Sequence, residues 1–434
     1  MPKVLHISTS GNDANPGTYK SPKRSPQTAN ELSAGDTALF RMGDVFTPTS
    51  KDSTFITLKT NGVTFDAYPG PTRAAYPSFS HTGVKSVVFG VLGNDNLFQH
   101  LDVWNAETGM AVYQTHTGNV IDQCRIQDFG YGIVDKGNNT IIQNSYLARG
   151  RMTRDTGAKT DAGANAIVLE RVDKHTHTGT RILNLFIEDC EAPSKAFGTD
   201  GSAFEIYGGV EDVLIAGCFM WRVKIGLELG GVTARKETIR TFTFKENVVL
   251  APLAYFNPST DQFYADLAAV SFERNVINNP KDDKSNVYFG GPWGSLIGRV
   301  AFTNNLMTGA APMYAASSGT DLNSIPRAGN VYSTSNVGIP LALSESVQPI
   351  SYVNAEAHDY RLSAPMIMPD GTSYTPGAWG LVTPFGDEEY SVPTMKNLFT
   401  MSAVNLYPGK RCFVGQTRTL FEMAEDLATW LVVG

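Results

Sequence analysis

The chain has 434 residues, and its 35 basic and 42 acidic residues leave a net charge of −7. No cluster of Lys and Arg is dense enough to hold a phosphate backbone, which excludes nucleic acid and an anionic membrane surface as expected partners. With 41 glycines, 23 prolines and 18% charged residues, the composition is typical of a turn-rich β protein with little helix.

The amino-terminal segment MPKVLHISTS lacks a basic region followed by an apolar stretch, so the sequence predicts no signal peptide. Because no run of 18 apolar residues occurs, we expect no insertion into a membrane and a soluble protein. The four cysteines, Cys124, Cys190, Cys218 and Cys412, are too few for a disulfide framework and lack the spacing of metal ligands. We expect reduced thiols and no bound metal.

A short apolar strand that ends in Asn or Cys recurs along the chain. It is written VIDQC, TIIQN, FIEDC, VLIAGC, TFKEN, SFERN, AFTNN and RAGN, ending at Cys124, Asn144, Cys190, Cys218, Asn247, Asn275, Asn305 and Asn330. From Cys190 onward the repeats are about 25 to 30 residues apart. The longer interval between Asn144 and Cys190 holds either one repeat with a long insertion or two ordinary repeats.

A repeat of this length, with two or three alternating strands and no helical segment, predicts a β-solenoid rather than leucine-rich repeats. Successive coils would stack at the ordinary interstrand distance of about 4.8 Å, so equivalent residues would lie directly above one another. The recurring Asn and Cys residues are then expected to form buried ladders in which amides pair along the stack. Residues 148–165 form a polar, glycine-bearing insertion, which is either a loop that contacts a ligand or a tolerated excursion.

Two strands carry one carboxylate each in matching positions. In AFEIYGG, alternation places Ile206 inside and Glu205 outside, and in IGLELGG it places Leu229 inside and Glu228 outside. A register shifted by one residue would set Glu228 opposite Ile206 and exchange the two faces of the strand. The apolar pattern therefore predicts that Glu205 and Glu228 stack on neighbouring coils.

Two stacked carboxylates repel each other unless they share a proton, which raises one pKa and leaves an acid beside a carboxylate near neutral pH. Cleavage of a glycosidic bond requires this combination, so Glu205 and Glu228 are the predicted catalytic pair. Asp200, in GTDGSAFE, is a third candidate, or only the first residue of an Asp-Gly turn. Glu205 with Glu228 would suit a retaining enzyme, and Asp200 with Glu228 an inverting one.

The same outward face is expected to bind sugar. Aromatic rings suit the C–H surfaces of pyranose rings, and Tyr288, in NVYFGG, is placed outward two coils beyond Glu228. Arg222 and Lys224 either contact the substrate or merely neutralise the two glutamates. The predicted substrate-binding residues are Tyr207, Trp221, Arg222, Lys224, Tyr255, Tyr288 and Trp293.

The carboxy-terminal stretch TLFEMAEDLATWLVVG has apolar residues at helical spacing. It predicts a short terminal helix that covers an open end of the solenoid or contacts a sister subunit. We expect three regions: an N-terminal cap with the first coils (1–75), the solenoid (76–380) and a small C-terminal segment (381–434).

Three segments carry a resemblance to a known superfamily. They run from His6 to Phe46, from Phe55 to Pro71 and from Tyr352 to Gly380. The first two resemble the N-terminal cap and first coil, and the third the closing segment, of the pectate-lyase-like right-handed single-stranded parallel β-helix superfamily, above all bacteriophage tailspikes and related polysaccharide depolymerases. The resemblance implies that fold, a homotrimer on the virion assembled in a bacterial cytoplasm, contacts with other virion proteins, and a bacterial surface polysaccharide as ligand.

Three functions follow from these observations. The first is a glycosidase that needs no cofactor and hydrolyses the polysaccharide through its paired carboxylates. A polysaccharide lyase would instead use Lys195, Arg222 or Lys224 on a uronate, with Ca²⁺ or a basic residue neutralising the uronate carboxylate, but the dense aspartate cluster of the calcium-dependent pectate lyases is missing. The third is a non-catalytic virion spike or decoration protein that binds glycan or only builds structure.

Overall fold

The computed structural model describes most of the first 354 residues and several short stretches after them. The described ranges are 2–48, 54–70, 76–82, 85–157, 163–170, 177–230, 237–256, 264–281, 284–290, 294–309, 312–317, 319–354, 359–364, 366–367, 373–374, 389–392, 411–414, 419–423 and 430–432. The domain boundaries expected near residues 75 and 380 both fall outside these ranges.

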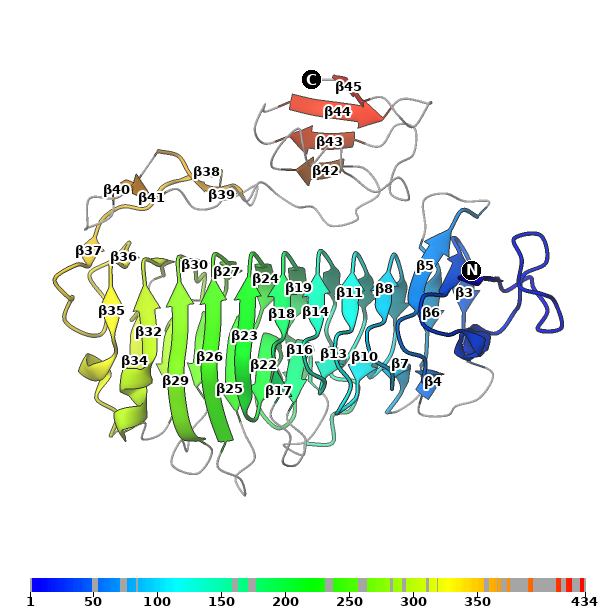
Figure 1. Cartoon of the computed structure of the whole chain (residues 1–434). Coiled ribbons are helices and arrows are strands. Elements are labelled where there is room, and N and C mark those ends of the chain that lie inside the picture. The colour runs from blue at the N-terminus through cyan, green and yellow to red at the C-terminus, as the bar shows by residue number, and fades with distance from the viewer. Residues whose placement is uncertain are drawn as a thin grey trace.

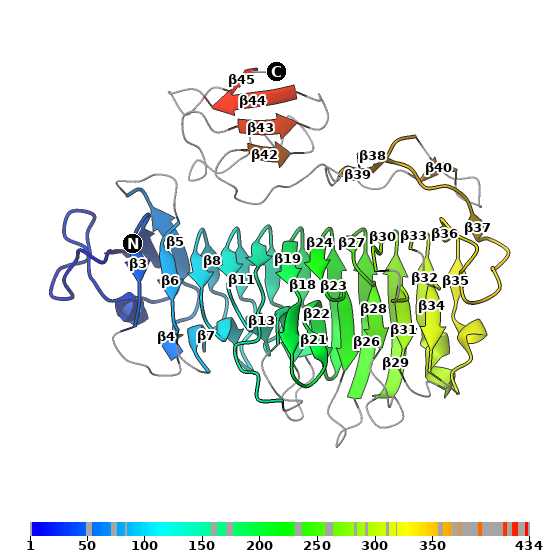
Figure 2. The ribbon, with the colours of Figure 1, turned by 180° about the vertical axis from the view of Figure 1, so that it is seen from behind.

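The described part of the chain winds into a solenoid of three parallel sheets, here named sheets I, II and III in the order in which each coil visits them. Figures 1 and 2 show the sheets running side by side along one axis from the amino-terminal coils to β35. Every strand of a sheet pairs in parallel with the equivalent strand of the next coil, and the coils turn right-handedly. The protein is a right-handed parallel β-helix, as predicted.

Sheet I carries the candidate site and has 10 strands in the described residues. They are β4 (Thr54–Leu58), β7 (Val87–Val91), β10 (Thr108–Val112), β13 (Tyr131–Asp135), β16 (Asn165–Glu170), β22 (Ser202–Tyr207), β25 (Leu227–Gly230), β28 (Ala254–Phe256), β31 (Val287–Phe289) and β34 (Tyr314–Ala316).

Sheet II has 13 strands in the described residues. They are β1 (Val4–Ile7), β2 (Thr37–Arg41), β5 (Thr64–Tyr68), β8 (Leu97–Gln99), β11 (Val120–Asp122), β14 (Ile141–Gln143), β17 (His177–Thr178), β18 (Arg181–Leu183), β23 (Val210–Ala216), β26 (Glu237–Lys245), β29 (Tyr264–Glu273), β32 (Val300–Thr303) and β35 (Arg327–Ala328).

Sheet III has 12 strands in the described residues. They are β3 (Val45–Phe46), β6 (Ser78–Ser80), β9 (Asp102–Trp104), β12 (Arg125–Gln127), β15 (Tyr146–Ala148), β19 (Phe186–Cys190), β24 (Phe219–Val223), β27 (Val248–Leu250), β30 (Val276–Asn278), β33 (Leu306–Thr308), β36 (Val331–Tyr332) and β37 (Ser346–Val347).

The remaining elements are short. Helix in the described residues is limited to the 3-10 turns η1 (Pro26–Glu31), η2 (Gly294–Arg299) and η3 (Leu322–Ser324), none of which is long enough to cross a bilayer. Small sheets are formed by β20 (Ala192–Ser194) with β21 (Gly198–Asp200), β38 (Tyr352–Asn354) with β39 (Asp359–Leu362), β40 (Met366–Ile367) with β41 (Ser373–Tyr374), and β42 (Glu389–Val392), β43 (Arg411–Val414), β44 (Thr419–Met423) and β45 (Trp430–Val432).

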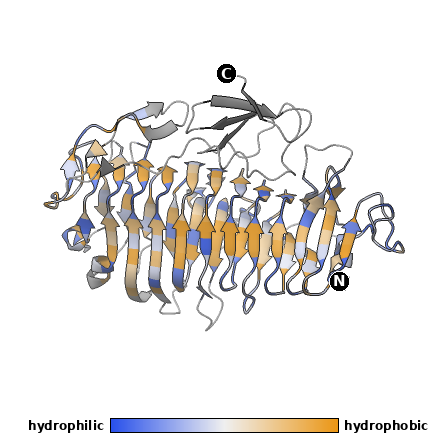
Figure 3. Ribbon diagram, turned by 45° about the horizontal axis from the view of Figure 1, so that its top comes forward, coloured by the Kyte–Doolittle hydropathy of each residue, from blue (hydrophilic) through white to orange (hydrophobic). Residues whose placement is uncertain are grey.

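The core fills the interior between the three sheets. Alternate residues of each strand point inward, so hydrophobic positions form rows along the axis in Figure 3. Because equivalent residues superpose, aromatic rings stack from coil to coil: Phe272 on Phe302 at 4.7 Å and Phe256 on Phe289 at 4.4 Å. The described cysteines, Cys124, Cys190 and Cys218, are buried and unpaired, as expected.

A buried asparagine ladder holds the turn between sheets II and III. Asn275 receives hydrogen bonds on Oδ1 from the backbone N and the Nδ2 of Asn247, at 3.0 and 3.1 Å. Its own Nδ2 donates to the Phe244 carbonyl at 3.0 Å and to Asn305 Oδ1 at 2.9 Å. The same pattern links Asn305 to Asn330. The predicted amide ladder is therefore confirmed over these coils.

Two residues predicted in the ladder do not occupy it. Asn144 has φ 49° and lies one position earlier, where asparagine tolerates the left-handed turn, and Ser145 takes the ladder position and receives the Cys124 backbone N–H. Cys190 ends strand β19, and Leu185 fills the position in that coil. Since β14 pairs directly with β18, the long interval holds one coil with insertions.

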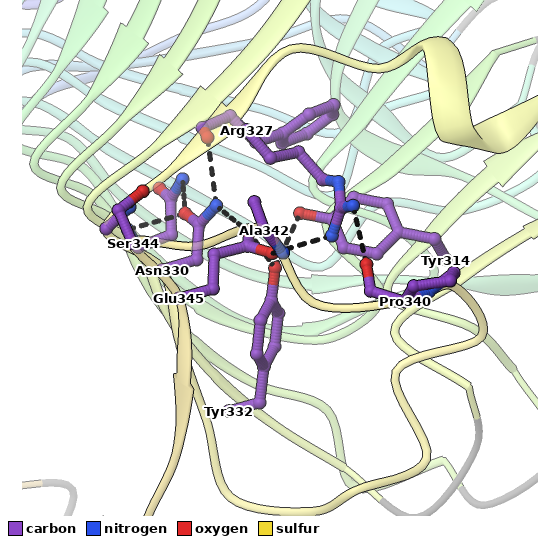
Figure 4. A network of polar contacts seen from close by, with 11 residues as sticks. Tyr314, Arg327, Asn330, Tyr332, Pro340, Ala342, Ser344 and Glu345 are labelled. Atoms are coloured by element: carbon purple, nitrogen blue, oxygen red, sulfur yellow. Dashed lines mark hydrogen bonds and ion pairs between the residues drawn. The ribbon is translucent and has the colours of Figure 1, made fainter. Parts of the chain in front are cut away.

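A buried polar network ends the ladder at its carboxy-terminal coil (Figure 4). Asn330 Nδ2 donates to Glu345 Oε1 at 2.8 Å, and the Tyr332 hydroxyl donates to the same oxygen at 2.6 Å. Arg327 donates to Glu345 Oε2 at 2.7 Å, so the buried carboxylate is paired with a cation. The last amide of the stack thus has a partner in Glu345, which precedes β37 at the position equivalent to Asn330.

The chain then returns along the outer face of sheet III. Ile350, Tyr352, Leu362 and Met366 pack on the outward residues of β27, β30, β33 and β36. In Figures 1 and 2, β38 to β41 lie beside this face. The return segment covers apolar side chains that would otherwise face water.

The terminal helix expected in residues 419–434 is wrong for the described residues, which form strands β44 and β45. β44 pairs antiparallel with both β43 and β45. Phe421 and Met423 are also two residues apart, as on one face of a strand, and pairing with neighbouring strands favours the strand over the helix. Whether this sheet contacts a sister subunit stays a prediction.

We expect Asn275→Ala to lower the free energy of unfolding by about 2–4 kcal/mol, because the Asn247 N–H and the Phe244 carbonyl lose their buried partner. Chemical denaturation followed by circular dichroism measures the loss. Cys218→Ala is the matched control at an equivalent position, where the side chain makes only a 3.6 Å sulfur contact, and should cost less. Equal losses in the two variants would contradict a stabilising role of the amides.

Candidate active site

Strands β22 and β25 bring the two predicted carboxylates together. Glu205 of β22 pairs in register with Glu228 of β25, and Ile206 pairs with Leu229 beside them. Ile206 and Leu229 are buried in the core, so both carboxylates face outward from sheet I. The predicted register is confirmed, because the apolar residues on the inward face leave no room for a shift by one.

Two tyrosines extend the same outward row into the following coils. Glu228 pairs with Tyr255, and Tyr255 pairs with Tyr288, as the sequence predicted for Tyr288. The two rings stack with centroids 5.7 Å apart and an interplanar angle of 19°. Tyr288 is 37% exposed, so a flat aromatic surface adjoins the carboxylate pair.

In the coils that precede Glu205, the same outward row of side chains is shielded from solvent. The equivalent residues of the two preceding coils are Val168 and Val134, which are only 5% and 7% exposed. The outward face is therefore more open toward Tyr255 and Tyr288 than toward the amino-terminal coils.

The environment of Glu205 favours its protonated form. Burial is the main cause that raises the pKa of Glu205 to about 8, and the charges of Glu228, Asp200 and Glu170 add to it. Lys224 acts in the opposite direction. Near neutral pH Glu205 therefore keeps its proton beside the second carboxyl group, that of Glu228.

Asn165 of strand β16 holds one oxygen of Glu205. Its Nδ2 donates to Glu205 Oε2 at 2.7 Å, and its Oδ1 accepts a hydrogen bond of 3.0 Å from the Ser202 hydroxyl. Asn165 pairs with Ser202 across adjacent strands, and both side chains are buried. These contacts restrict the orientation of the Glu205 carboxyl group.

Asp200 lies on a hairpin, β20–β21, that leaves the coil just before Glu205. Lys224 Nζ is 3.5 Å from Asp200 Oδ1 and 6.0 Å from the ring of Phe197, which is 51% exposed at the hairpin turn. A Cβ on Gly163 would lie 2.6 Å from Asp200 Oδ2, so a side chain there would displace the carboxylate from this position. Asp200 and Lys224 thus border the Glu205 site.

The insertion after β15 lies against this hairpin. Lys195 donates from its backbone N to Asp155 Oδ1 at 3.0 Å and from Nζ to the Asp155 carbonyl at 2.7 Å. Arg154, of the same insertion, is 3.6 Å from Glu107, and both charges act on the buried hydroxyl of Tyr131 together with Glu205. The described residues of the insertion therefore lie beside the candidate site.

Two predicted ligand-binding residues belong elsewhere. Trp221 and Arg222 lie on β24 of sheet III, not on the face of Glu205. Arg222 stacks on Trp221 at 3.5 Å and forms ion pairs with Asp189 and Glu188. Since Arg222 is bound there, it does not neutralise the carboxylate pair. The prediction relied on their closeness to Glu228 in sequence, but the chain passes from sheet III to sheet I between β24 and β25.

The remaining predicted residues are placed as follows. Tyr207 follows Glu205 on β22, is 37% exposed and pairs with Glu170 of β16. Burial is the first cause of its raised pKa, and the Glu205 charge is the second. Trp293 lies outside the described residues.

Sequence reasoning missed Asn165, Tyr131 and Phe197. Asn165 could have been found by aligning NAIVLE with SAFEIY, which sets Val168 above Glu205. Phe197 carries no such signal, because a hairpin brings it to the site. Tyr131 begins β13 and pairs with Asn165, so the same alignment of strands could have found it. Among the described residues, no three His, Cys, Asp or Glu side chains are grouped as ligands for a metal ion.

Comparison with solved structures supports the fold. A rhamnogalacturonan lyase superposes with a TM-score of 0.52 at 15% identity, over 76% of this chain and 87% of that chain. A crystal structure of pectate lyase Pel9A superposes with a TM-score of 0.51 at 15% identity, over 88% and 90%. No protein-family model and no curated protein matches the sequence. The chain has the pectate-lyase-like parallel β-helix fold.

We expect the free energy of unfolding to fall as the pH rises from about 5 to about 8. In this interval the unfolded chain has lost the Glu205 proton, whereas the folded protein, in which the pKa of Glu205 is raised to about 8, still binds it. Below and above this window the contribution of Glu205 to the slope vanishes.

Melting temperatures measured from pH 4.5 to pH 9, as a range chosen to span roughly both pKa values, test this expectation. Glu205→Gln should flatten the profile and melt higher than the wild type at pH 8. Glu211→Gln, an exposed position on β23, is the control and should keep the wild-type slope. Identical slopes in wild type and Glu205→Gln would refute the raised pKa.

Proposed function

We propose that this protein is a glycoside hydrolase that cleaves a polysaccharide with Glu205 as general acid and Glu228 as its carboxylate partner. The observation that carries the proposal is the in-register stacking of the two glutamates on the outward face of sheet I. The raised pKa of Glu205 supports it, because a carboxyl group that keeps its proton near neutral pH can protonate a leaving group.

In the proposed reaction Glu205 gives its proton to the glycosidic oxygen while the bond from that oxygen to the anomeric carbon breaks. Glu228, ionised, stabilises the positive charge that develops on the sugar ring. Residues on adjacent strands are about 4.8 Å apart, which suits direct attack by Glu228 on the anomeric carbon and retention of configuration. Water, activated by the now ionised Glu205, then releases the sugar from Glu228.

The glycan is proposed to lie over Tyr255 and Tyr288. Their stacked rings present a flat apolar surface in the coils that follow Glu228, and the face is more exposed there than over Val168 and Val134. Pyranose rings offer C–H faces that pack on such a surface. Tyr207 and Phe197 are exposed on the flanks of the carboxylate pair and would contact sugars next to the cleaved bond.

The lyase remains the second candidate because Lys224 borders the carboxylates. Of the three predicted bases, Lys195 is held by Asp155 and Arg222 by Asp189 on another sheet. Lys224 is 3.5 Å from Asp200, and the surrounding carboxylates disfavour a uronate whose charge must be neutralised. Hydrolysis of a glycan without uronates fits the charge of this face better.

The biological setting is a further part of the proposal. The segments that resemble phage tailspikes support a trimeric protein on the virion that binds a bacterial surface polysaccharide. Sedimentation velocity of the full chain tests the trimer, and labelled antibodies on purified virions test the location.

Incubation with capsular polysaccharides and lipopolysaccharides from candidate hosts separates the three functions. New reducing ends without ultraviolet absorbance indicate hydrolysis, absorbance of unsaturated sugars indicates a lyase, and binding without products indicates a non-catalytic spike. The panel should include neutral and uronate-bearing glycans. We expect reducing ends from a neutral glycan.

We expect Glu228→Gln and Glu205→Gln to lower kcat by at least about 10²-fold, because each removes one partner of the acid–carboxylate pair. Reducing-end assays measure the loss, and binding of the intact glycan to the inactive variants confirms folding. Glu211→Gln should retain wild-type kcat. A Glu228→Gln variant with unchanged kcat would remove Glu228 from the mechanism.

We expect Tyr288→Ala to weaken glycan binding by about 2- to 10-fold, because a stacking platform is lost while the carboxylates stay in place. Affinity electrophoresis in gels cast with the cleaved glycan, using Glu228→Gln as background, measures the change. Tyr19→Ala, at an exposed aromatic residue of the N-terminal cap, is the control. Unchanged binding by Tyr288→Ala would place the glycan elsewhere.

A further inference from the structure

Asn165 and Ser202 form a chain of hydrogen bonds that ends on Glu205. The Ser202 hydroxyl donates to Asn165 Oδ1 at 3.0 Å, and Asn165 Nδ2 donates to Glu205 Oε2 at 2.7 Å. Ser202 is fully buried and Asn165 is 7% exposed, so bulk water does not compete for these bonds. The three side chains come from strands β16 and β22, which pair in register.

An asparagine amide has a donor end and an acceptor end, which are not interchangeable. With Oδ1 engaged by Ser202, the Nδ2 end faces Glu205 and can only donate. Glu205 Oε2 therefore accepts this hydrogen bond. An oxygen that accepts a hydrogen bond from Asn165 cannot at the same time donate the acid proton toward Asn165. A proton on Glu205 then resides on Oε1, the oxygen that Asn165 does not contact.

We propose that Asn165 is a positioning residue that directs the acid proton of Glu205 to Oε1 and that the hydrogen bond from Ser202 holds the Asn165 amide in place. The inference rests on the proposed function for its catalytic meaning, because only an acid with its proton on the oxygen facing the substrate can protonate a leaving group. The arrangement of the three side chains can be tested without any glycan.

The sign of one pKa change decides between the two amide orientations. A donor to the carboxylate stabilises the ionised form, so its removal raises the pKa of Glu205. In the opposite orientation Asn165 Oδ1 would accept the proton of neutral Glu205, and removal of that acceptor would lower the pKa of Glu205. The two arrangements therefore predict shifts in opposite directions.

The experiment is a carbon-13 titration of the full-length protein labelled at the glutamate carboxyl carbon, with Glu205→Gln identifying the Glu205 signal. In Asn165→Ala the Glu205 pKa should rise by about 1–2 pH units relative to wild type, the value of a hydrogen bond to a charged group. Ser202→Ala should shift it in the same direction by less. Asn323→Ala, at an exposed turn, should leave it unchanged.

A Glu205 pKa that falls or does not move in Asn165→Ala overturns the proposal. If Asn165→Ala does not fold by circular dichroism, Ser202→Ala decides, and an unchanged Glu205 pKa in that variant overturns it equally. With a glycan that the wild type cleaves, the alkaline limb of the pH–rate profile should move to higher pH in Asn165→Ala with KM unchanged. Failure of every glycan to be cleaved would count against the hydrolase alone, because the titration does not depend on cleavage.

Discussion

Parallel, in-register pairing of successive coils is the constraint on which the rest of this structure depends. It places equivalent residues above one another at the interstrand distance, so each side chain lies against the equivalent side chain of the next coil. Inside, this produces stacked phenylalanines and an asparagine ladder in which each amide meets an identical amide. Outside, the same rule sets Glu205 against Glu228.

The inside and the outside respond to this rule in opposite ways. Identical amides stabilise one another, because each has both a donor and an acceptor, and the last one ends on Glu345, which Arg327 neutralises. Identical carboxylates have no donor and repel. The chain tolerates this where one glutamate keeps its proton, which the burial of Glu205 favours.

Insertions between coils complete the site without disturbing the register. The described part of the loop after β15 and the β20–β21 hairpin leave the solenoid at corners between sheets and meet through Lys195 and Asp155. The hairpin brings Asp200 and Phe197 to a face that already carries Tyr131 on β13. A rigid scaffold with variable corner loops is a common way to place functional side chains. The resemblance to lyases of low sequence identity therefore identifies the scaffold, while the chemistry depends on these residues.

The sequence by itself determined the solenoid, the inward and outward faces of its strands, and the stacking of Glu205 on Glu228. These follow from local alternation and from a repeat length that nearly every coil shares. The sequence could not separate Asn144 from Ser145, because the turn residue with positive φ and the ladder residue are neighbours. It could not recognise Leu185 instead of Cys190, because Cys190, which ends β19, matched the repeated pattern of a strand that ends in Asn or Cys. Tertiary structure alone decided that Trp221 and Arg222 face another sheet, that β44 is a strand and that Asn165 donates to Glu205. In each case a contact between residues distant in sequence outweighs the local pattern, and only the path of the chain around its corners brings those residues together.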